Sequence, residues 1–142
     1  MLGKITVVVA DDSDSFRQTL CTYLNMEPEI QVVGEARNGY EVLDCIRRFS
    51  PNILLLDLQM PGLDGKEVLR QLSILSDTRV IILSGYTNDD HYQTLKNHDL
   101  VCGWFTKGNS PMTLVDRILK ASGLLGGDSP GYPGFSHNYH NP

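Results

Sequence analysis

The sequence predicts one α/β domain in which a five-stranded parallel sheet is flanked by helices. The length of 142 residues suits about one domain with one core. Short apolar runs of strand length lie at residues 5–10, 30–35, 53–56, 80–83 and 101–105. Segments with helical spacing separate them, so strand and helix alternate five times along the chain. This alternation requires parallel strands, right-handed crossovers and a three-layer sandwich.

Four of the five runs are nearly unbroken and rich in branched side chains, which is typical of strands buried on both faces. The run at 30–35 alternates more, with Ile30, Val32 and then Gly34, and this pattern suits the edge of a sheet.

The helices are predicted from apolar stripes and from start signals. The stripes are Phe16, Leu20, Tyr23 and Leu24; Val42, Ile46 and Phe49; Val68, Leu72 and Leu75; and Leu114, Val115, Ile118 and Leu119. Asn38, Asp64 and Ser110 each stand where an N-cap belongs, and Asp12 or Asp14 could cap the first helix. A further helix at 88–97 has only Tyr92 and Leu95 as anchors, so we expect it to be the least firmly seated.

Composition excludes several classes of protein. With 41% hydrophobic and 20% charged residues, the chain is too apolar to be disordered. A net charge of −5 argues against direct binding to nucleic acid, which needs a basic face. No apolar run is long enough to cross a membrane, and the start of the chain does not resemble a secretory signal, so we expect a cytoplasmic protein.

The cysteines and the C-terminal segment complete the organisation. Cys21, Cys45 and Cys102 are odd in number and lie in regular segments, so we expect reduced, packed thiols. After Gly123 the chain becomes dense in Gly, Pro, Ser and Asn. We therefore expect a domain over residues 1–123 and a tail or linker over 124–142.

Polar residues follow four of the predicted strands. They are Asp11 and Asp12 after the first, Asp57 after the third, Ser84 after the fourth and Lys107 after the fifth. In open parallel sheets such residues meet beyond the carboxyl ends of the strands.

Carboxylates brought together in this way repel each other by roughly 4 kcal/mol per pair at about 4 Å, so a cation must offset them. Mg²⁺ and the Lys107 ammonium would do so, and Ser84 could meet a phosphoryl group. Asp57 would then be a competent nucleophile toward phosphorus and would form an aspartyl phosphate.

The chain resembles the receiver domain of two-component response regulators, and most closely the receivers of LuxR-like transcriptional regulators. The resemblance covers about residues 4–121 and rests on the segments ADDSDSFRQTL, GEARNGYEVLD, ILLLDLQMPGLDG, VIILSGY and GWFTKGNS, of which DLQMPGLDG is the most specific. It implies a flavodoxin-like fold with strand order 2-1-3-4-5.

The resemblance also implies a metal site and a phosphoacceptor. Asp57 would accept the phosphoryl group. Asp12, Asp57 and the carbonyl of Gln59 would bind Mg²⁺ directly, and Asp11 would act through water. The donor would be a histidine kinase or a histidine phosphotransfer protein.

Three further residues carry the implied switch. Ser84 would be the switch hydroxyl, Lys107 would contact the phosphate, and Trp104 would change rotamer with the switch. The output surface would run from the fourth helix to the fifth, and a homodimer through this face is implied as well. Gly108 departs from the family, which often has Pro there, and Trp104 is larger than the usual Tyr or Phe.

Other functions fit the residues less well. A Mg²⁺-dependent phosphatase or phosphotransferase with an aspartyl-phosphate intermediate needs an acid/base carboxylate where Gln59 stands. A flavin carrier would need phosphate-binding loops where Asp11 and Asp12 stand, and an unphosphorylated scaffold would not need the full set of polar residues. We therefore expect a phosphorylation switch and not an enzyme. It either acts alone or is a fragment of a transcription regulator without its effector domain.

Overall fold

The computed structural model describes residues 3–62, 64–85, 95 and 97–123. The strands are β1 (Ile5–Ala10), β2 (Ile30–Ala36), β3 (Ile53–Asp57), β4 (Arg79–Ser84) and β5 (Val101–Thr106). The helices are α1 (Asp14–Asn25), α2 (Gly39–Phe49), α3 (Gly65–Leu75) and α5 (Pro111–Ala121). The predicted helix at 88–97 and the tail at 124–142 lie outside the described residues, apart from isolated positions within the first of them.

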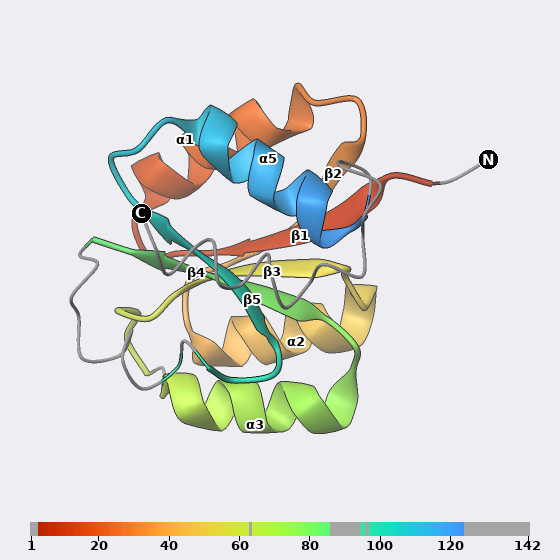
Figure 1. The fold of residues 1–142 in the computed structure, drawn as a ribbon. Helices are drawn as coiled ribbons and strands as arrows, with labels where there is room; N and C mark the ends of the chain where they lie inside the picture. Colours follow the sequence, from red (N-terminus) through yellow and green to blue (C-terminus); the bar gives the residue numbers. More distant parts are fainter. Residues whose placement is uncertain (1–2, 63, 86–94, 96, 124–142) are drawn as a thin grey trace.

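The strands form one parallel sheet in the order β2-β1-β3-β4-β5. Helices α1 and α5 cover one face of this sheet, and α2 and α3 cover the other (Figure 1). The predicted strand order and three-layer architecture are therefore confirmed, and β2 is an edge strand as its alternating pattern indicated.

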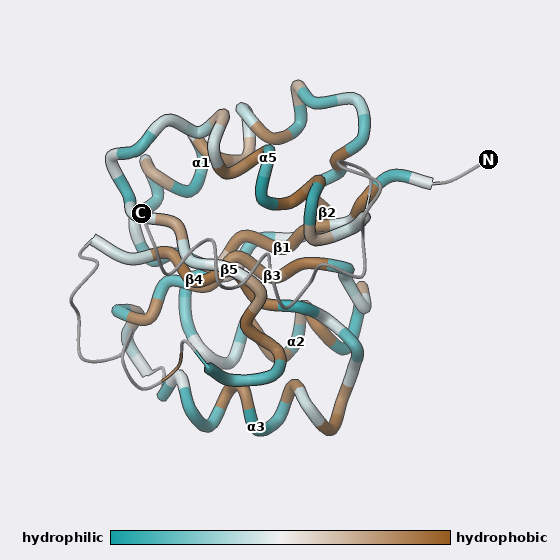
Figure 2. The backbone as a smooth tube through the Cα atoms, viewed as in Figure 1, coloured by the Kyte–Doolittle hydropathy of each residue, from teal (hydrophilic) through white to brown (hydrophobic). Residues whose placement is uncertain are grey.

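Side chains of the inner strands divide between two cores because successive residues of a strand point to opposite faces. On β1, Val7 and Val9 pack toward α1 and α5, whereas Val8 and Ala10 pack toward α2 and α3. All four are 0% exposed, which explains the unbroken apolar run. Figure 2 shows the same distribution, with hydrophobic residues concentrated in the central strands.

Side-chain oxygens cap the helices at their N-termini. Asn38 accepts from the N–H of Glu41, and Ser110 accepts from the N–H of Met112. The predicted caps of α2 and α5 are correct. The prediction for α1 is wrong, because its cap is Ser13, whose hydroxyl accepts from the N–H of Phe16, and neither Asp12 nor Asp14 takes this place.

Among the described residues, no helix is both long and apolar enough to span a membrane.

Candidate functional site

The residues singled out in the sequence lie at one edge of the sheet. Asp11 directly follows β1, Asp57 ends β3, Ser84 ends β4 and Lys107 directly follows β5. Because all strands are parallel, these positions share the carboxyl edge. β2 adds none of them, since it lies on the outer side of β1.

Three carboxylates form the centre of the site. Asp11, Asp12 and Asp57 each offer one oxygen within 4.8 Å of the other two. Asp11 is 0% exposed and Asp57 is 4% exposed, whereas Asp12 faces solvent. Two of the three charges are therefore poorly screened by water, and their mutual repulsion calls for a positive partner.

Lys107 supplies one positive charge. Its Nζ lies 2.7 Å from Oδ2 of Asp11 and 3.2 Å from Oδ2 of Asp57. It also lies 4.8 Å from the centre of the Phe16 ring, which gives the ammonium a favourable aromatic face. Burial lowers the pKa of Lys107, but the two carboxylates outweigh it and the net pKa is raised, so the side chain remains a cation.

Backbone donors hold two of the carboxylates in place. The N–H of Gln59 donates to Oδ1 of Asp57 at 2.9 Å, and the N–H of Ser13 donates to Oδ1 of Asp11 at 2.8 Å. Burial raises the pKa of Asp57, although the Gln59 N–H and Lys107 act in the opposite direction. The fold thus holds Asp57 where its charge is partly uncompensated.

The donor set suits a hard divalent cation. Oδ2 of Asp11 is buried and accepts no hydrogen bond of acceptable geometry from the described residues, so its contact with Lys107 is an ion pair by distance only. Carboxylates, a carbonyl and waters are the usual ligands of Mg²⁺. Asp11, Asp12 and Asp57 therefore fit such an ion.

Ser84 ends β4 at the carboxyl edge of the sheet, and Trp104 lies on the neighbouring strand β5. Ser84 is 6% exposed and pairs with Thr106 across β4 and β5. Its carbonyl accepts from the N–H of Lys107 at 2.7 Å. Trp104 is buried in the core that faces α2 and α3, and its carbonyl accepts a hydrogen bond from Arg117. The larger ring thus fits inward in this structure.

The loop after β5 depends on Gly108. Its φ of +99° lies in the region that favours glycine. Proline cannot adopt this conformation, since its ring fixes φ near −65°. The departure from the usual family residue at this position therefore corresponds to a different loop geometry.

Sequence reasoning missed two residues that contact the site. Phe16 was taken only as a core residue, yet its ring lies against Lys107. Arg17 is 6% exposed and donates to the carbonyl of Asp11 at 2.8 Å. A signal existed for Arg17, since it stands three and seven residues before Leu20 and Leu24, on the stripe that packs against the sheet.

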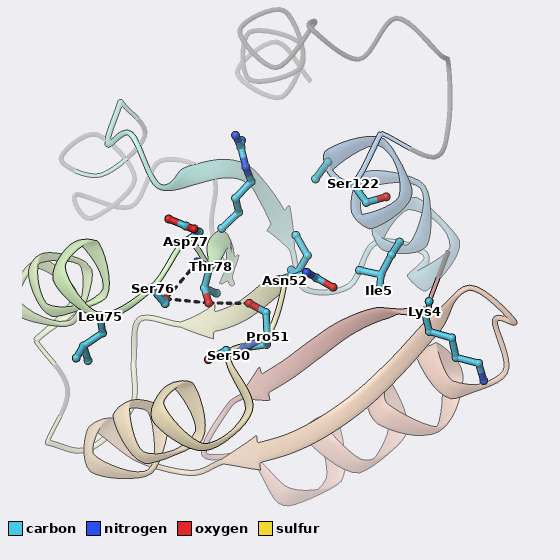
Figure 3. A pocket seen from close by; sticks show the side chains of 14 residues that line it. Lys4, Ile5, Ser50, Pro51, Asn52, Leu75, Ser76, Asp77, Thr78 and Ser122 are labelled. Carbon is cyan, nitrogen blue, oxygen red and sulfur yellow. Dashed lines mark hydrogen bonds between the residues drawn. The ribbon is translucent and has the colours of Figure 1, made fainter. Parts of the chain in front are cut away.

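A cavity of about 670 Å³ lies at the opposite edge of the sheet, where the strands begin (Figure 3). Thr78 closes one side of it by donating to the carbonyl of Pro51 at 2.7 Å, and Ser76 donates to Thr78 at 3.0 Å. It includes none of the predicted site residues, so the acidic site is defined by its charges and not by this cavity.

The doubly wound fold, with carboxylates and a lysine at the carboxyl edge, defines a receiver-type signalling module. Comparison with protein families agrees, since residues 7–119 match the response regulator receiver domain. The chain belongs to this family, whose members are phosphorylatable modules of two-component signal transduction.

Individual relatives support the assignment. The transcriptional regulatory protein LiaR of Bacillus subtilis is 38% identical over 120 residues, which cover 83% of this chain and 56% of that protein. A protein-glutamate methylesterase/protein-glutamine glutaminase of Nitratidesulfovibrio vulgaris is 41% identical over 96 residues, covering 68% of this chain and 26% of that protein. The receiver domain of NarL from Mycobacterium tuberculosis superposes with a TM-score of 0.75 at 31% identity and covers 85% of this chain and 98% of that one.

The chain therefore spans about a quarter to a half of the length of such curated relatives. What it shares with them is the receiver domain.

Proposed function

We propose that this chain is a Mg²⁺-dependent switch in which Asp57 accepts a phosphoryl group from a histidine kinase or a histidine phosphotransfer protein. The observation that carries the proposal is the group of three carboxylates within 4.8 Å of one another, with Lys107 2.7 Å from Asp11 and 3.2 Å from Asp57. Membership of the receiver family supports it.

Asp12, Asp57 and the carbonyl of Gln59 are the proposed direct ligands of the metal site, and Asp11 is proposed to act through a bound water. Bound Mg²⁺ supplies positive charge that offsets the carboxylates and the incoming phosphoryl oxygens. A carboxylate oxygen of Asp57 forms a bond to phosphorus while the bond from phosphorus to the donor imidazole nitrogen breaks. The leaving imidazole takes a proton from solvent, and an acyl phosphate remains on Asp57.

Lys107 and Ser84 are proposed to respond to the new group. A phosphoryl group adds about −1.5 to −2 charge and three acceptor oxygens. The Lys107 ammonium can pair with it, and the Ser84 hydroxyl can donate to it. Movement of Ser84 would then vacate space for the side chain of Trp104, on the neighbouring strand, so that Trp104 changes rotamer. The output face and the predicted homodimer depend on the fourth helix, which is outside the described residues, and they stay predictions.

The relatives support a proposal for the wider role of the protein. By analogy with the transcriptional regulatory protein LiaR, we propose that the switch regulates transcription through a separate effector domain, in the cytoplasm and without direct DNA contact by this segment. The methylesterase relatives leave a second kind of effector open for the whole protein. The phosphatase alternative is not favoured, because Gln59 offers a backbone N–H to Asp57 and no acid/base carboxylate.

Phosphoryl labelling tests the proposal directly. The protein is incubated with phosphoramidate and Mg²⁺, and the label is located by mass spectrometry after reduction with borohydride. We expect one phosphoryl group per chain on Asp57, and no labelling when a chelator removes Mg²⁺.

Two variants make the test specific. Asp57→Asn should abolish labelling, whereas Asp64→Asn, which changes an exposed capping aspartate of α3, should label like the parent. Labelling that survives in Asp57→Asn, or that ignores the chelator, would contradict the proposal.

A further inference from the structure

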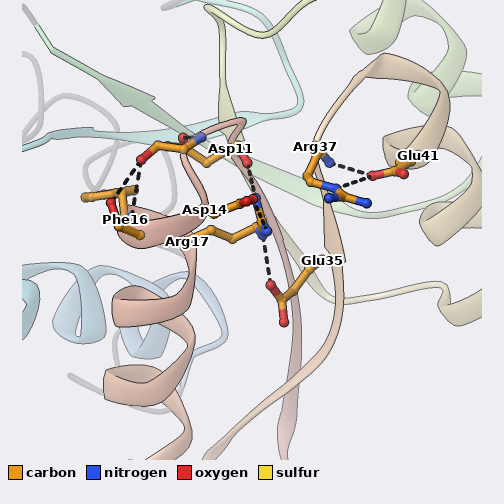
Figure 4. A network of polar contacts seen from close by, with 9 residues as sticks. Asp11, Asp14, Phe16, Arg17, Glu35, Arg37 and Glu41 are labelled. Atoms are coloured by element: carbon orange, nitrogen blue, oxygen red, sulfur yellow. Dashed lines mark hydrogen bonds and ion pairs between the residues drawn. The ribbon is translucent and has the colours of Figure 1, made fainter.

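Arg17 is a charged residue that the fold buries beside the acidic site. It stands in the first turns of α1 and is 6% exposed. Its guanidinium binds three oxygens from three segments: the Asp11 carbonyl at 2.8 Å, Oδ1 of Asp14 at 2.7 Å and Oε1 of Glu35 at 2.8 Å. Figure 4 shows Arg17 between the end of β1, the start of α1 and β2. It therefore joins three parts of the chain at one point.

These three contacts differ in whether water can replace Arg17 as the partner of the oxygen. The side chains of Asp14 and Glu35 are 63% and 47% exposed, so water can replace Arg17 at either carboxylate. The contact with the Asp11 carbonyl is buried, so that oxygen would lose its donor. The two carboxylates offset the burial of the guanidinium, and the carbonyl is the group that Arg17 fixes.

The Asp11 carbonyl is placed where it controls the metal ligands. It belongs to the planar peptide unit that joins the Cα atoms of Asp11 and Asp12. The orientation of this plane sets the direction in which both side chains leave the backbone. The N–H of Asp11 donates to the carbonyl of Ala36 at 3.0 Å, and the N–H of Ser13 donates to Oδ1 of Asp11. Arg17 holds the Asp11 carbonyl oxygen, which lies between these two anchors.

We propose that Arg17 is a positioning residue of the metal site, which holds the Asp11–Asp12 peptide so that both carboxylates face Asp57 before the cation arrives. The proposal rests on the proposed function, since it assumes that these carboxylates bind Mg²⁺. Outer partners of metal ligands commonly contribute 10–100-fold to metal affinity. Arg17 would act in this way through the backbone that joins two carboxylates of the metal site, Asp11 and Asp12.

Mg²⁺ binding by Arg17→Gln tests this role. We expect calorimetry to give a dissociation constant about 10–100-fold higher than in the parent. The rate of labelling by phosphoramidate should fall at low Mg²⁺ but return to within about twofold of the parent at saturating Mg²⁺. A residue that acts on the reacting atoms would instead lower the saturated rate.

A second measurement needs no metal and no reaction. The Ser13 N–H is bonded to Oδ1 of Asp11, so its hydrogen exchange reports how well the loop is held. In metal-free Arg17→Gln we expect Ser13 to exchange faster, with exchange in the centre of β3 unchanged. Arg17→Lys should recover part of the affinity, because an ammonium can reach one of the three oxygens but lacks the planar fork. If Arg17→Gln does not fold, Arg17→Lys carries the test.

Two control variants separate positioning from general effects of charge. Arg70 pairs with Glu67 at the same i,i+3 spacing as Arg17 and Asp14, but it lies on the exposed side of α3. Arg70→Gln should therefore bind Mg²⁺ like the parent. Glu35→Gln keeps the carbonyl contact, so it should weaken binding less than Arg17→Gln.

The outcomes are distinguishable. If the parent itself does not bind Mg²⁺ and is not labelled, the proposed function fails and this inference fails with it. If the parent binds Mg²⁺ and folded Arg17→Gln binds equally well, only the role of Arg17 is overturned. An effect of Glu35→Gln as large as that of Arg17→Gln would also overturn it, because the carbonyl contact would then not be the decisive one.

Discussion

Burial acts against the charge of Asp57 before any cation is bound. Its pKa is raised from 3.8, mainly because the carboxyl is buried, and the charge of Asp11 adds to this effect. The folded state therefore holds the Asp57 proton more tightly than the unfolded chain does. The Asp57 carboxyl therefore makes its full contribution to the free energy of unfolding below pH 3.8, the pKa in the unfolded chain. This contribution is lost as the pH rises through the higher pKa of the folded state. At neutral pH the ionised carboxyl lowers the stability of the metal-free protein.

Removing this charge should therefore stabilise the metal-free protein. At pH 7 we expect Asp57→Asn to raise the free energy of unfolding of the metal-free protein by on the order of 1 kcal/mol. This is a net effect, since the variant loses its ion pair with Lys107 but also loses the repulsion from Asp11 and the cost of burying a charge. Urea denaturation in the presence of a chelator measures it. In Mg²⁺ at 100 times its dissociation constant the order should reverse, because the parent gains about 2.7 kcal/mol and the variant lacks a ligand. A variant less stable than the parent in chelator would refute this reasoning.

At the same scale, the sequence identified the ionisable residues of the site but not how they are held. Asp11, Asp57 and Lys107 could be named because each follows a buried strand, and parallel strands bring such positions together. The ion pair that accompanies the burial of Arg17 could not be derived from the local pattern, because its partner Glu35 lies 18 residues further along the chain on strand β2. The contact between Phe16 and Lys107 likewise exists only after α1 and β5 have packed.

At the scale of elements, the strands were predictable because double-sided burial demands continuous apolar runs. β1 begins and ends where the sequence predicted, whereas β3, β4 and β5 extend by one or two residues into polar positions such as Asp57 and Ser84. Hydrogen bonding to a neighbouring strand continues past the last apolar residue, which hydropathy alone cannot show. The prediction of the α1 cap was wrong because Ser13 and its two acidic neighbours are all competent capping residues, and the sequence does not show which of them takes the position.

Helix α3 gives an element-scale prediction. Oδ1 of Asp64 accepts from the N–H groups of Lys66 and Glu67 at 3.0 and 3.4 Å. Asp64→Ala removes this cap and should lower the free energy of unfolding by about 1 kcal/mol, measured by urea denaturation. Asp64→Asn keeps an acceptor oxygen and should stay within about 0.5 kcal/mol of the parent. Equal losses in the two variants would mean that the charge near the helix dipole matters more than the cap.

At the scale of the whole molecule, the three cysteines are distributed over both hydrophobic cores. Cys21 on α1 and Cys102 on β5 belong to the core beneath α1 and α5, and Cys45 on α2 belongs to the opposite one. All three are free and buried. Burial raises the pKa of the Cys21 thiol to about 11 and that of the Cys102 thiol to about 12, and it raises the pKa of Cys45 as well. Because the thiolate is the reactive form, these groups should react only after the structure opens.

Thiol labelling therefore connects the acidic site with the stability of the whole fold. We expect a disulfide reagent such as dithionitrobenzoate to label native protein far more slowly than urea-unfolded protein. Some cysteines will be labelled only after the whole protein unfolds, with unfolding and refolding faster than the labelling reaction. For these cysteines, Mg²⁺ at 100 times its dissociation constant should lower the labelling rate about 100-fold, because Mg²⁺ binds the folded state and not the unfolded state. Asp57→Asn, which lacks a ligand, should show no such slowing. If Mg²⁺ does not change the labelling rate of a cysteine in the parent, that cysteine becomes accessible by local opening and not by global unfolding. Cys45 is the first candidate for such behaviour, because it lies on α2 beside the edge strand β2.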